Sequence, residues 1–231
     1  MSYFSEPNYS GSSYRYVITP QMADVYAAGL IYGASTTTRT GNTVYGFNSN
    51  AGNNAVYDAA TNASLAFCVW DAGGTDTFDF SGYSQDQTIS LVAASFSNVG
   101  GLTSNVSIAY NVTIENADGG SGNDTITGNG AANTIAGNGG NDTITGGLGN
   151  DTIDGGTGTD TLVLSGARAD YTFAAVDATY TSATDLRSGG DGVDLLSSIE
   201  YIRFTDGTFA LGSLVTTTTG GTGGGTGGGT D

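Results

Sequence analysis

Five nine-residue units, placed back to back over residues 119–163, constrain the fold more than any other feature. They read GGSGNDTIT, GNGAANTIA, GNGGNDTIT, GGLGNDTID and GGTGTDTLV. The first six positions hold mostly Gly, Asn and Asp, which tolerate tight turns and positive φ. The last three positions form a short β-prone triplet. A chain with this period is expected to stack its turns and strands into a solenoid.

Each triplet has one aliphatic residue at its centre, and the five are Ile126, Ile135, Ile144, Ile153 and Leu162. One buried aliphatic side chain offsets too little of the conformational entropy that ordering nine residues costs. Position six, an Asp in four of the five units, indicates that a hard cation with oxygen ligands supplies the rest. Ca²⁺ fits best. The alternative is a flexible Gly/Asn-rich linker, which has no reason to keep an aliphatic residue every nine positions.

The period also predicts which units lie next to each other. If each unit is half a turn of the solenoid, units n and n+2 stack on the same side. Asp124, Asp142 and Asp160 then line one edge, which we call the first edge, and Asn133 and Asp151 line the second edge. The first edge offers two cation sites. The second offers one weaker site, because Asn133 supplies a neutral oxygen and an Ala replaces a loop glycine.

The composition excludes several functions. The formal charge is −17, from 22 acidic and 5 basic residues, which argues against nucleic acid or an anionic membrane as partner. The absence of His excludes His-based zinc sites and Ser-His or Cys-His catalysis. Cys68, in the apolar run LAFCVW, is expected to be a buried small hydrophobe, and a single Cys forms no internal disulfide. No apolar run is long enough to span a membrane, and no N-terminal signal peptide is visible.

The chain divides by composition into several segments. Residues 1–19 are polar, and a helix is predicted from Pro20, with Thr19 as its N-cap, to Gly33. Short strands are predicted from Ala34 to Asn116, for example at 42–47, 65–70, 76–81 and 106–114. After the repeats, TLVLS, DYTFAAV, ATYTSATDL and EYIRFTDGTFAL read as strands of a terminal cap. Residues 216–231 read as a flexible Gly/Thr linker.

Longer stretches of the chain resemble a known family. IYGASTTTRTGNTVYGFNSNAG, WDAGGTDTFDFSGYSQDQTISL and VSIAYNVTIENADGGSGND closely resemble the C-terminal half of serralysin-type secreted metalloproteases. The repeats match the calcium-binding nonapeptide of RTX proteins. MSYFSE at 1–6 looks like the Met-turn of those proteases, and the helix ending LIYG looks like the last helix of their catalytic domain. The segment DLRSGGDGVDLLSSIEYIRFTDGTFALGSL is similar to caps in many type I secreted proteins.

The resemblance implies an all-β fold. It consists of a right-handed parallel β-roll with β-sandwich-like strands before it, a C-terminal β cap after it and one short N-terminal helix. The expected divisions are a protease-domain remnant at 1–33, a β-rich lead-in at 34–118, the repeats at 119–163, the cap at 164–215 and the linker at 216–231.

The resemblance also implies calcium ligands. Two sites precede the repeats, one formed by Arg39, Gly41, Thr43, Asp71 and Gly73, the other by Gly74, Asp76, Thr113 and Glu115. On the first edge, Gly120, Gly122 and Asp124 pair with Gly137, Gly139 and Asp142, and Asn138, Gly140 and Asp142 pair with Gly155, Thr157 and Asp160. On the second edge, Asn129, Ala131 and Asn133 pair with Gly146, Leu148 and Asp151.

The catalytic signature of the family is missing. The zinc-binding HExxHxxGxxH helix is absent, and Tyr3, which matches a family residue that can contact zinc, holds no ion alone. We therefore expect a secreted, extracellular calcium-binding module that uses type I secretion machinery, with several Ca²⁺ ions, no zinc and no proteolytic activity. Two other readings stay open: a fragment of an active metalloprotease, and a spacer of a surface adhesin, which the Gly/Thr tail favours.

Overall fold

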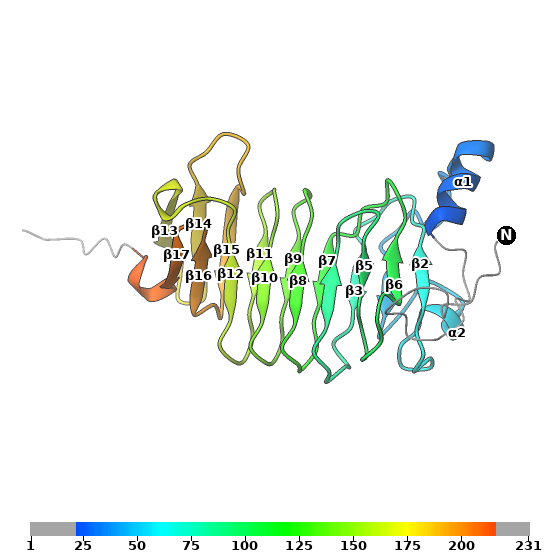
Figure 1. The fold of residues 1–231 in the computed structure, drawn as a ribbon, viewed down its shortest axis with the longest axis horizontal. Helices are drawn as coiled ribbons and strands as arrows, with labels where there is room; N and C mark the ends of the chain where they lie inside the picture. The colour runs from blue at the N-terminus through cyan, green and yellow to red at the C-terminus, as the bar shows by residue number, and fades with distance from the viewer. Residues whose placement is uncertain (1–21, 216–231) are drawn as a thin grey trace, which may run out of the picture.

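The computed structural model describes residues 22–215. The predicted Met-turn segment with Tyr3, the predicted N-cap Thr19 with Pro20, and the Gly/Thr linker lie outside the described residues. Within them, the chain forms an elongated stack of short strands, with a helix near one end and antiparallel hairpins at the other (Figure 1).

The strands of the repeats alternate between two sheets. Their bounds are β7 (Asn116–Asp118), β8 (Thr125–Thr127), β9 (Thr134–Ala136), β10 (Thr143–Thr145), β11 (Thr152–Asp154) and β12 (Thr161–Val163). An eight-stranded sheet contains β7, β9 and β11, and a six-stranded sheet contains β8, β10 and β12. Pairing is parallel and joins equivalent positions, with Thr125 opposite Thr143 and Thr143 opposite Thr161. The prediction that units n and n+2 stack is therefore confirmed.

The five central aliphatic residues of the repeats form the middle of the core. Ile126, Ile144, Ile153 and Leu162 are completely buried, and Ile135 is 1% exposed. The flanking threonines of the same triplets are mostly part-buried or exposed. The alternation within each triplet therefore places one apolar side chain per strand into the space between the two sheets.

The lead-in strands are divided among three sheets. β1 (Val44–Gly46) and β3 (Thr77–Asp79) extend the eight-stranded sheet, and β4 (Thr88–Ser90) extends the six-stranded one. β2 (Phe67–Val69), β5 (Phe96–Ser97) and β6 (Val106–Ile108) form a separate three-stranded sheet. The expected sandwich-like flank is thus partly a continuation of the stack that the repeats form.

Aromatic side chains fill the interior of this lead-in. Tyr45, Phe67, Phe78 and Phe80 are at most 2% exposed, and the ring centroids of Tyr45 and Phe78 lie 6.2 Å apart. Cys68 is buried among them, as predicted. The strand predicted at 106–114 ends at Ile108, and turns follow it.

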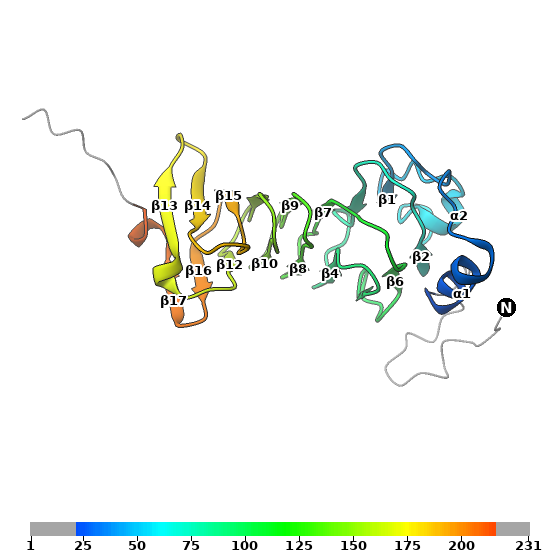
Figure 2. The same cartoon turned by 90° about the horizontal axis from the view of Figure 1, so that it is seen from above.

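The cap closes both sheets. β13 (Tyr171–Ala175), β14 (Thr181–Asp185) and β15 (Val193–Ser197) run antiparallel, and β15 pairs in parallel with β11. β16 (Tyr201–Phe204) and β17 (Gly207–Ala210) form a hairpin, and β16 pairs in parallel with β12. Two 3-10 turns, Arg168–Asp170 and Leu211–Ser213, flank these strands. The predicted strands at β13, β14, β16 and β17 are confirmed, whereas β15 was not predicted and TLVLS contributes β12 of the repeats. Figure 2 shows the cap across the end of the stack.

One longer helix, α1 (Met22–Tyr32), lies beside the lead-in (Figures 1 and 2). Met22 is buried, and the ring of Tyr26 packs at a tilt against that of Tyr110, with ring centroids 4.7 Å apart. Leu30, Ile31 and Tyr32 are 69%, 70% and 85% exposed, so the apolar side chains of the helix are only partly covered. A single turn, α2 (Asn54–Tyr57), was not predicted. Between residues 22 and 215, no helix has the length and apolar character that a membrane crossing requires.

Candidate metal sites along the two loop edges

The residue that precedes each strand of the repeats forms a rung in a ladder of side-chain hydrogen bonds. On the first edge, the backbone N–H of Asp124 donates to Oδ1 of Asp142 over 2.8 Å, and that of Asp142 donates to Oδ1 of Asp160 over 2.8 Å. On the second edge, the N–H of Asn133 donates to Oδ1 of Asp151 over 2.9 Å. These bonds hold each carboxylate between its own loop and the loop one turn away.

The structure extends both edges beyond the residues that sequence reasoning selected. The N–H of Gln87 donates to Oδ1 of Asp124 over 2.8 Å, and the N–H of Asp160 donates to Oε2 of Glu200 over 2.7 Å. The N–H of Asp151 donates to Oδ1 of Asp194 over 3.0 Å. Gln87 and Glu200 each stand one residue before a parallel strand, and Asp194 stands one residue before the part of β15 that pairs with β11.

The carboxylates of the ladder are buried and only half satisfied. Asp142 and Asp151 are 1% exposed, and Asp160 is 0% exposed. In each of them Oδ1 accepts a backbone N–H, whereas Oδ2 is buried and has no hydrogen-bond partner within the described chain. Burying an anionic oxygen without a partner is costly. These oxygens therefore mark positions at which a cation fits.

Glycines let these oxygens approach the neighbouring backbone. A Cβ atom added to Gly137 would lie 2.2 Å from Oδ2 of Asp142 and 2.6 Å from the carbonyl oxygen of Gly155. A Cβ atom on Gly119 would lie 2.6 Å from Oδ2 of Asp124 and 2.8 Å from the carbonyl oxygen of Gly137. A carboxylate of one loop and a carbonyl of the next therefore converge on the first edge. Such an all-oxygen donor set suits Ca²⁺.

Other predicted first-edge residues shape the loops. Gly140 has φ +109°, and a Cβ atom there would lie 2.1 Å from the carbonyl oxygen of Gly122. Asn138 has φ +71°, and its carbonyl oxygen accepts the N–H of Thr157 over 2.7 Å. The N–H of Gly139 donates to the carbonyl oxygen of Gly120 over 3.1 Å. The loops predicted to share an ion are thus in direct contact.

Burial and like charge raise the pKa of these carboxyls. The pKa of Asp142 rises to about 7, because burial penalises the charged form and Asp124 and Asp160 repel it. The pKa of Asp151 rises to about 6, again mainly through burial. Without a cation, the ladder therefore resists full ionisation at neutral pH.

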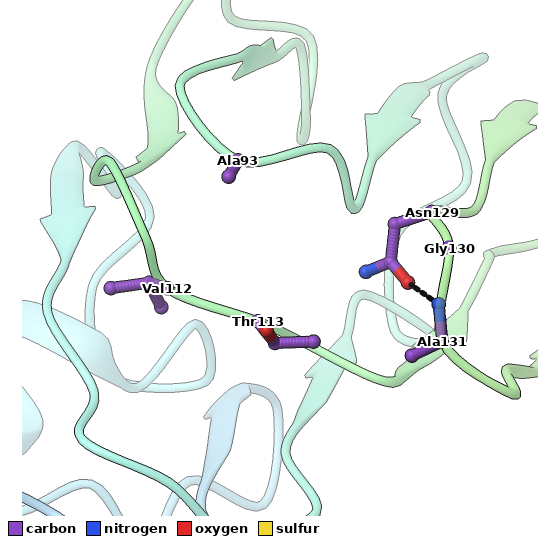
Figure 3. A pocket seen from close by; sticks show the side chains of 6 residues that line it. All are labelled: Ala93, Val112, Thr113, Asn129, Gly130 and Ala131. Carbon is purple, nitrogen blue, oxygen red and sulfur yellow. Dashed lines mark hydrogen bonds between the residues drawn. The ribbon is translucent and has the colours of Figure 1, made fainter.

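The second edge is bonded differently where Asn replaces Asp. Oδ1 of Asn133 accepts the N–H of Asn129 over 2.9 Å, and Nδ2 of Asn133 donates to the carbonyl oxygen of Glu115 over 2.8 Å. Asn129 accepts the N–H of Ala131 over 2.9 Å in the open pocket of Figure 3. A Cβ atom on Gly128 would lie 2.0 Å from the carbonyl oxygen of Gly146, while the Leu148 side chain is 52% exposed. The side-chain amides of Asn129 and Asn133 therefore make hydrogen bonds within the protein, including one that the Asn133 NH₂ group donates and a carboxylate could not donate.

The two predicted lead-in sites adjoin each other. The N–H of Thr43 donates to Oδ1 of Asp76 over 2.8 Å, and the N–H of Asp76 donates to Oε2 of Glu115 over 2.7 Å. Oδ2 of Asp76 is buried without a hydrogen-bond partner, and burial raises the pKa of Asp76 to about 6. A Cβ atom on Gly74 would lie 2.6 Å from the carbonyl oxygen of Gly41. This part of the ladder repeats the half-satisfied carboxylate of the repeats.

The other lead-in residues surround one pocket. Asp71, Gly73, Thr113 and Glu115 line it together. Oδ2 of Asp71 accepts the hydroxyl of Tyr45 over 2.8 Å. Arg39 has φ +52°, and its guanidinium donates to the carbonyl oxygens of Ala51 and Trp70. Because a guanidinium has no acceptor atom, Arg39 could bind a cation only through its backbone carbonyl. The structure thus brings members of both predicted lead-in sites to one place.

No group of three or more His, Cys, Asp or Glu side chains is placed to hold a metal ion anywhere in residues 22–215. The candidate sites differ from such clusters, because each combines one or two carboxylates with backbone carbonyls.

The fold and its edges define a repeat protein with oxygen-rich loops on two sides of a parallel stack. The family described as Peptidase M10 serralysin C terminal matches residues 34–216, so the chain belongs to that family. Metalloprotease AprA of Pseudomonas entomophila is 55% identical over 201 residues, which cover 84% of this chain and 40% of the relative. Serralysin B of Dickeya chrysanthemi is 58% identical over 129 residues, covering 54% of this chain and 26% of that protein. Serralysin of Proteus mirabilis is 56% identical over 133 residues, covering 57% and 27%.

The chain therefore spans well under half the length of these curated relatives. What it shares with them is the serralysin C-terminal region, which is the non-catalytic part of metalloproteases. The family resemblance predicted from the sequence is confirmed.

Proposed function

We propose that this chain is a calcium-binding module whose sheets form a right-handed parallel β-roll that folds only with the ion bound. The observation that carries the proposal is the row of buried carboxylate oxygens without partners, Oδ2 of Asp142, Asp151 and Asp160. A divalent cation would neutralise them and take carbonyl oxygens from the facing loops.

The proposed ligands are those that the sequence predicted. On the first edge, Asp142 serves two ions, one shared with Asp124 and one with Asp160. On the second edge, Asn133 and Asp151 serve one weaker site. Two further ions lie in the lead-in, with Asp71 and Asp76 as their main carboxylates. Calcium suits these sites better than Mg²⁺, which demands a tighter octahedron and keeps its waters.

The proposed role is to delay folding until export. An ion that binds only the folded chain stabilises it by RT ln(1 + [L]/Kd). In a calcium-poor cytosol, closely spaced carboxylates repel one another and the chain stays unfolded and competent for a type I secretion route. Outside the cell, abundant calcium drives folding. We also propose that the chain divides into five segments, with boundaries after residues 33, 118, 163 and 215.

The proposal is tested by circular dichroism during a calcium titration. We expect the β signal to be lost in EGTA and regained with Ca²⁺ but not with equal Mg²⁺. The same spectrum in EGTA and in calcium would refute calcium-dependent folding.

A second candidate function is that of the C-terminal part of a longer secreted metalloprotease. The exposed apolar side chains of Leu30, Ile31 and Tyr32 favour it, because such a face on α1 suits packing against a preceding domain. Expressing the uninterrupted reading frame and assaying it for zinc-dependent proteolysis would decide between the candidates. A frame without an HExxHxxGxxH segment would exclude the protease.

A further inference from the structure

The cap contains a segment with the pattern of the repeats. Residues 189–197 read GGDGVDLLS, which places glycines at positions one, two and four, Asp194 at position six and Leu196 at the central aliphatic position. β15 carries the last part of this segment and pairs in parallel with β11, with Leu196 opposite Ile153. Leu196 is 1% exposed. A 25-residue interval that contains the β13–β14 hairpin separates this unit from the other five.

Contacts within the second half of this loop repeat those of the first edge. The N–H of Val193 donates to Oδ1 of Asn150 over 2.9 Å, as the N–H of Thr159 does to Oδ1 of Asn141. A Cβ atom on Gly192, which has φ +99°, would lie 1.8 Å from the carbonyl oxygen of Gly149. At the equivalent place on the first edge, Gly158 gives 1.7 Å to the carbonyl oxygen of Gly140.

The loop below supplies a buried oxygen without a partner. Oδ1 of Asp151 accepts the N–H of Asn133, whereas Oδ2 is buried and unpartnered. A Cβ atom on Gly146 would lie 2.2 Å from this Oδ2, the same distance as from Gly137 to Oδ2 of Asp142. The latter oxygen lies beside the carbonyl of Gly155 in the next loop of its edge. On the second edge the next loop is 189–194, and it contacts Asp151 directly, because the N–H of Asp151 donates to Oδ1 of Asp194 over 3.0 Å.

We propose that a further Ca²⁺ site lies between loops 146–151 and 189–194, held by the carboxylates of Asp151 and Asp194 and the carbonyls of Gly147 and Gly149. The inference rests on the proposed calcium-binding function. It makes Asp194, which is 3% exposed, the position-six ligand of a sixth unit. This ion would join the repeats to the cap.

The first half of loop 189–194 departs from the repeats, because the chain enters it from β14. The carboxylate of Asp191 accepts the N–H and hydroxyl of Ser165 and the hydroxyl of Tyr171. The N–H of Asp191 donates to Oδ2 of Asp185 over 2.7 Å. The Asp191 carboxylate is therefore left out of the ligand set, and waters complete the coordination, as Ca²⁺ takes six to eight oxygens.

Native mass spectrometry of the full chain in a calcium series tests the proposal, with the wild type, Asp194→Asn and Asp177→Asn. Asn keeps an oxygen that can accept the Asp151 N–H but removes the charge. Asp177 accepts two N–H groups of its own exposed turn and serves as the matched cap control. We expect Asp194→Asn to hold one ion fewer than the wild type at the calcium concentration that just saturates the wild type, and Asp177→Asn to hold the same number.

An unchanged ion count in Asp194→Asn would overturn the inference while leaving calcium binding intact. Loss of every ion from that variant would also overturn it, because Asp194 would then support the whole fold rather than one site. A wild type that holds no calcium would instead refute the proposed function itself.

Discussion

The backbone N–H of Asp124 donates to Oδ1 of Asp142 over 2.8 Å and leaves Oδ2 of Asp142 buried without a partner. One oxygen thus fixes the register between two stacked loops, while the other faces the space that they enclose. The same arrangement recurs at Asp76, Asp151 and Asp160. Under the proposed function, the ladder would couple the packing of the loops to cation binding.

The first prediction concerns Asp142, which faces a loop on each side. Replacing it by Asn should raise the calcium concentration at the folding midpoint on the order of tenfold, which corresponds to about 1.4 kcal/mol. Asp154→Asn, at the exposed end of β11, is the control and should shift the midpoint little. Circular dichroism during calcium titration measures both midpoints. Equal shifts in the two variants would contradict the proposed role of Asp142 as a ligand of two ions.

A second prediction concerns Gly137. An Ala there would place its Cβ 2.2 Å from Oδ2 of Asp142, so the calcium-saturated protein should lose about 1–3 kcal/mol of unfolding free energy. Gly130 has no atom within 4 Å of an added Cβ and provides the matched control. Urea denaturation in saturating calcium gives both values. A Gly137→Ala variant as stable as Gly130→Ala would contradict the steric conflict that we expect between a Cβ at position 137 and Asp142.

The third prediction concerns pH in calcium-free protein. Burial raises the folded-state pKa of Asp142 to about 7 and of Asp76 and Asp151 to about 6, whereas the unfolded value is about 4. Between pH 4 and 7 the folded chain therefore binds more protons than the unfolded chain, so its stability falls as pH rises. Any β structure that persists in EGTA should melt at a higher temperature at pH 5 than at pH 8.

With calcium saturating, the order should reverse, because protons compete with the ion for the same oxygens. Thermal melts at both pH values, with and without calcium, measure this. A calcium-free melting temperature that rises from pH 5 to pH 8 would show that the carboxylates are not held in the buried state.

A fourth prediction concerns catalysis. A catalytic zinc site usually takes three protein ligands and an open position, and this chain has no His to supply them. Incubation with casein and Zn²⁺ in saturating calcium should give no cleavage. Chelator-sensitive, zinc-dependent digestion would contradict the non-enzymatic module.

The sequence alone predicted the repeats and their stacking, because one aliphatic residue every nine positions allows few arrangements. It did not predict that β1 and β3 extend the same sheet, since the pairing of Tyr45 with Phe78 joins distant segments without a shared period. Gln87 and Glu200 were missed as rungs because no glycine-rich loop precedes them in the sequence. Asp194 was missed because the β13–β14 hairpin separates its unit from the others.

The α1 helix shows another limit of sequence reasoning. The helix is rich in apolar residues, yet Met22 is buried while Leu30, Ile31 and Tyr32 are exposed. Apolar content in a helix shows that a face tends to pack, whereas which surface covers it depends on the whole protein.

Hydrogen exchange at the ladder amides tests the central claim most directly. The N–H groups of Asp124, Asn133 and Asp142 donate to carboxylates that we propose calcium holds in place. With saturating Ca²⁺, these amides should exchange slowly, and in EGTA they should exchange at rates close to those of an unfolded chain. Equal protection in calcium and in EGTA would contradict the account.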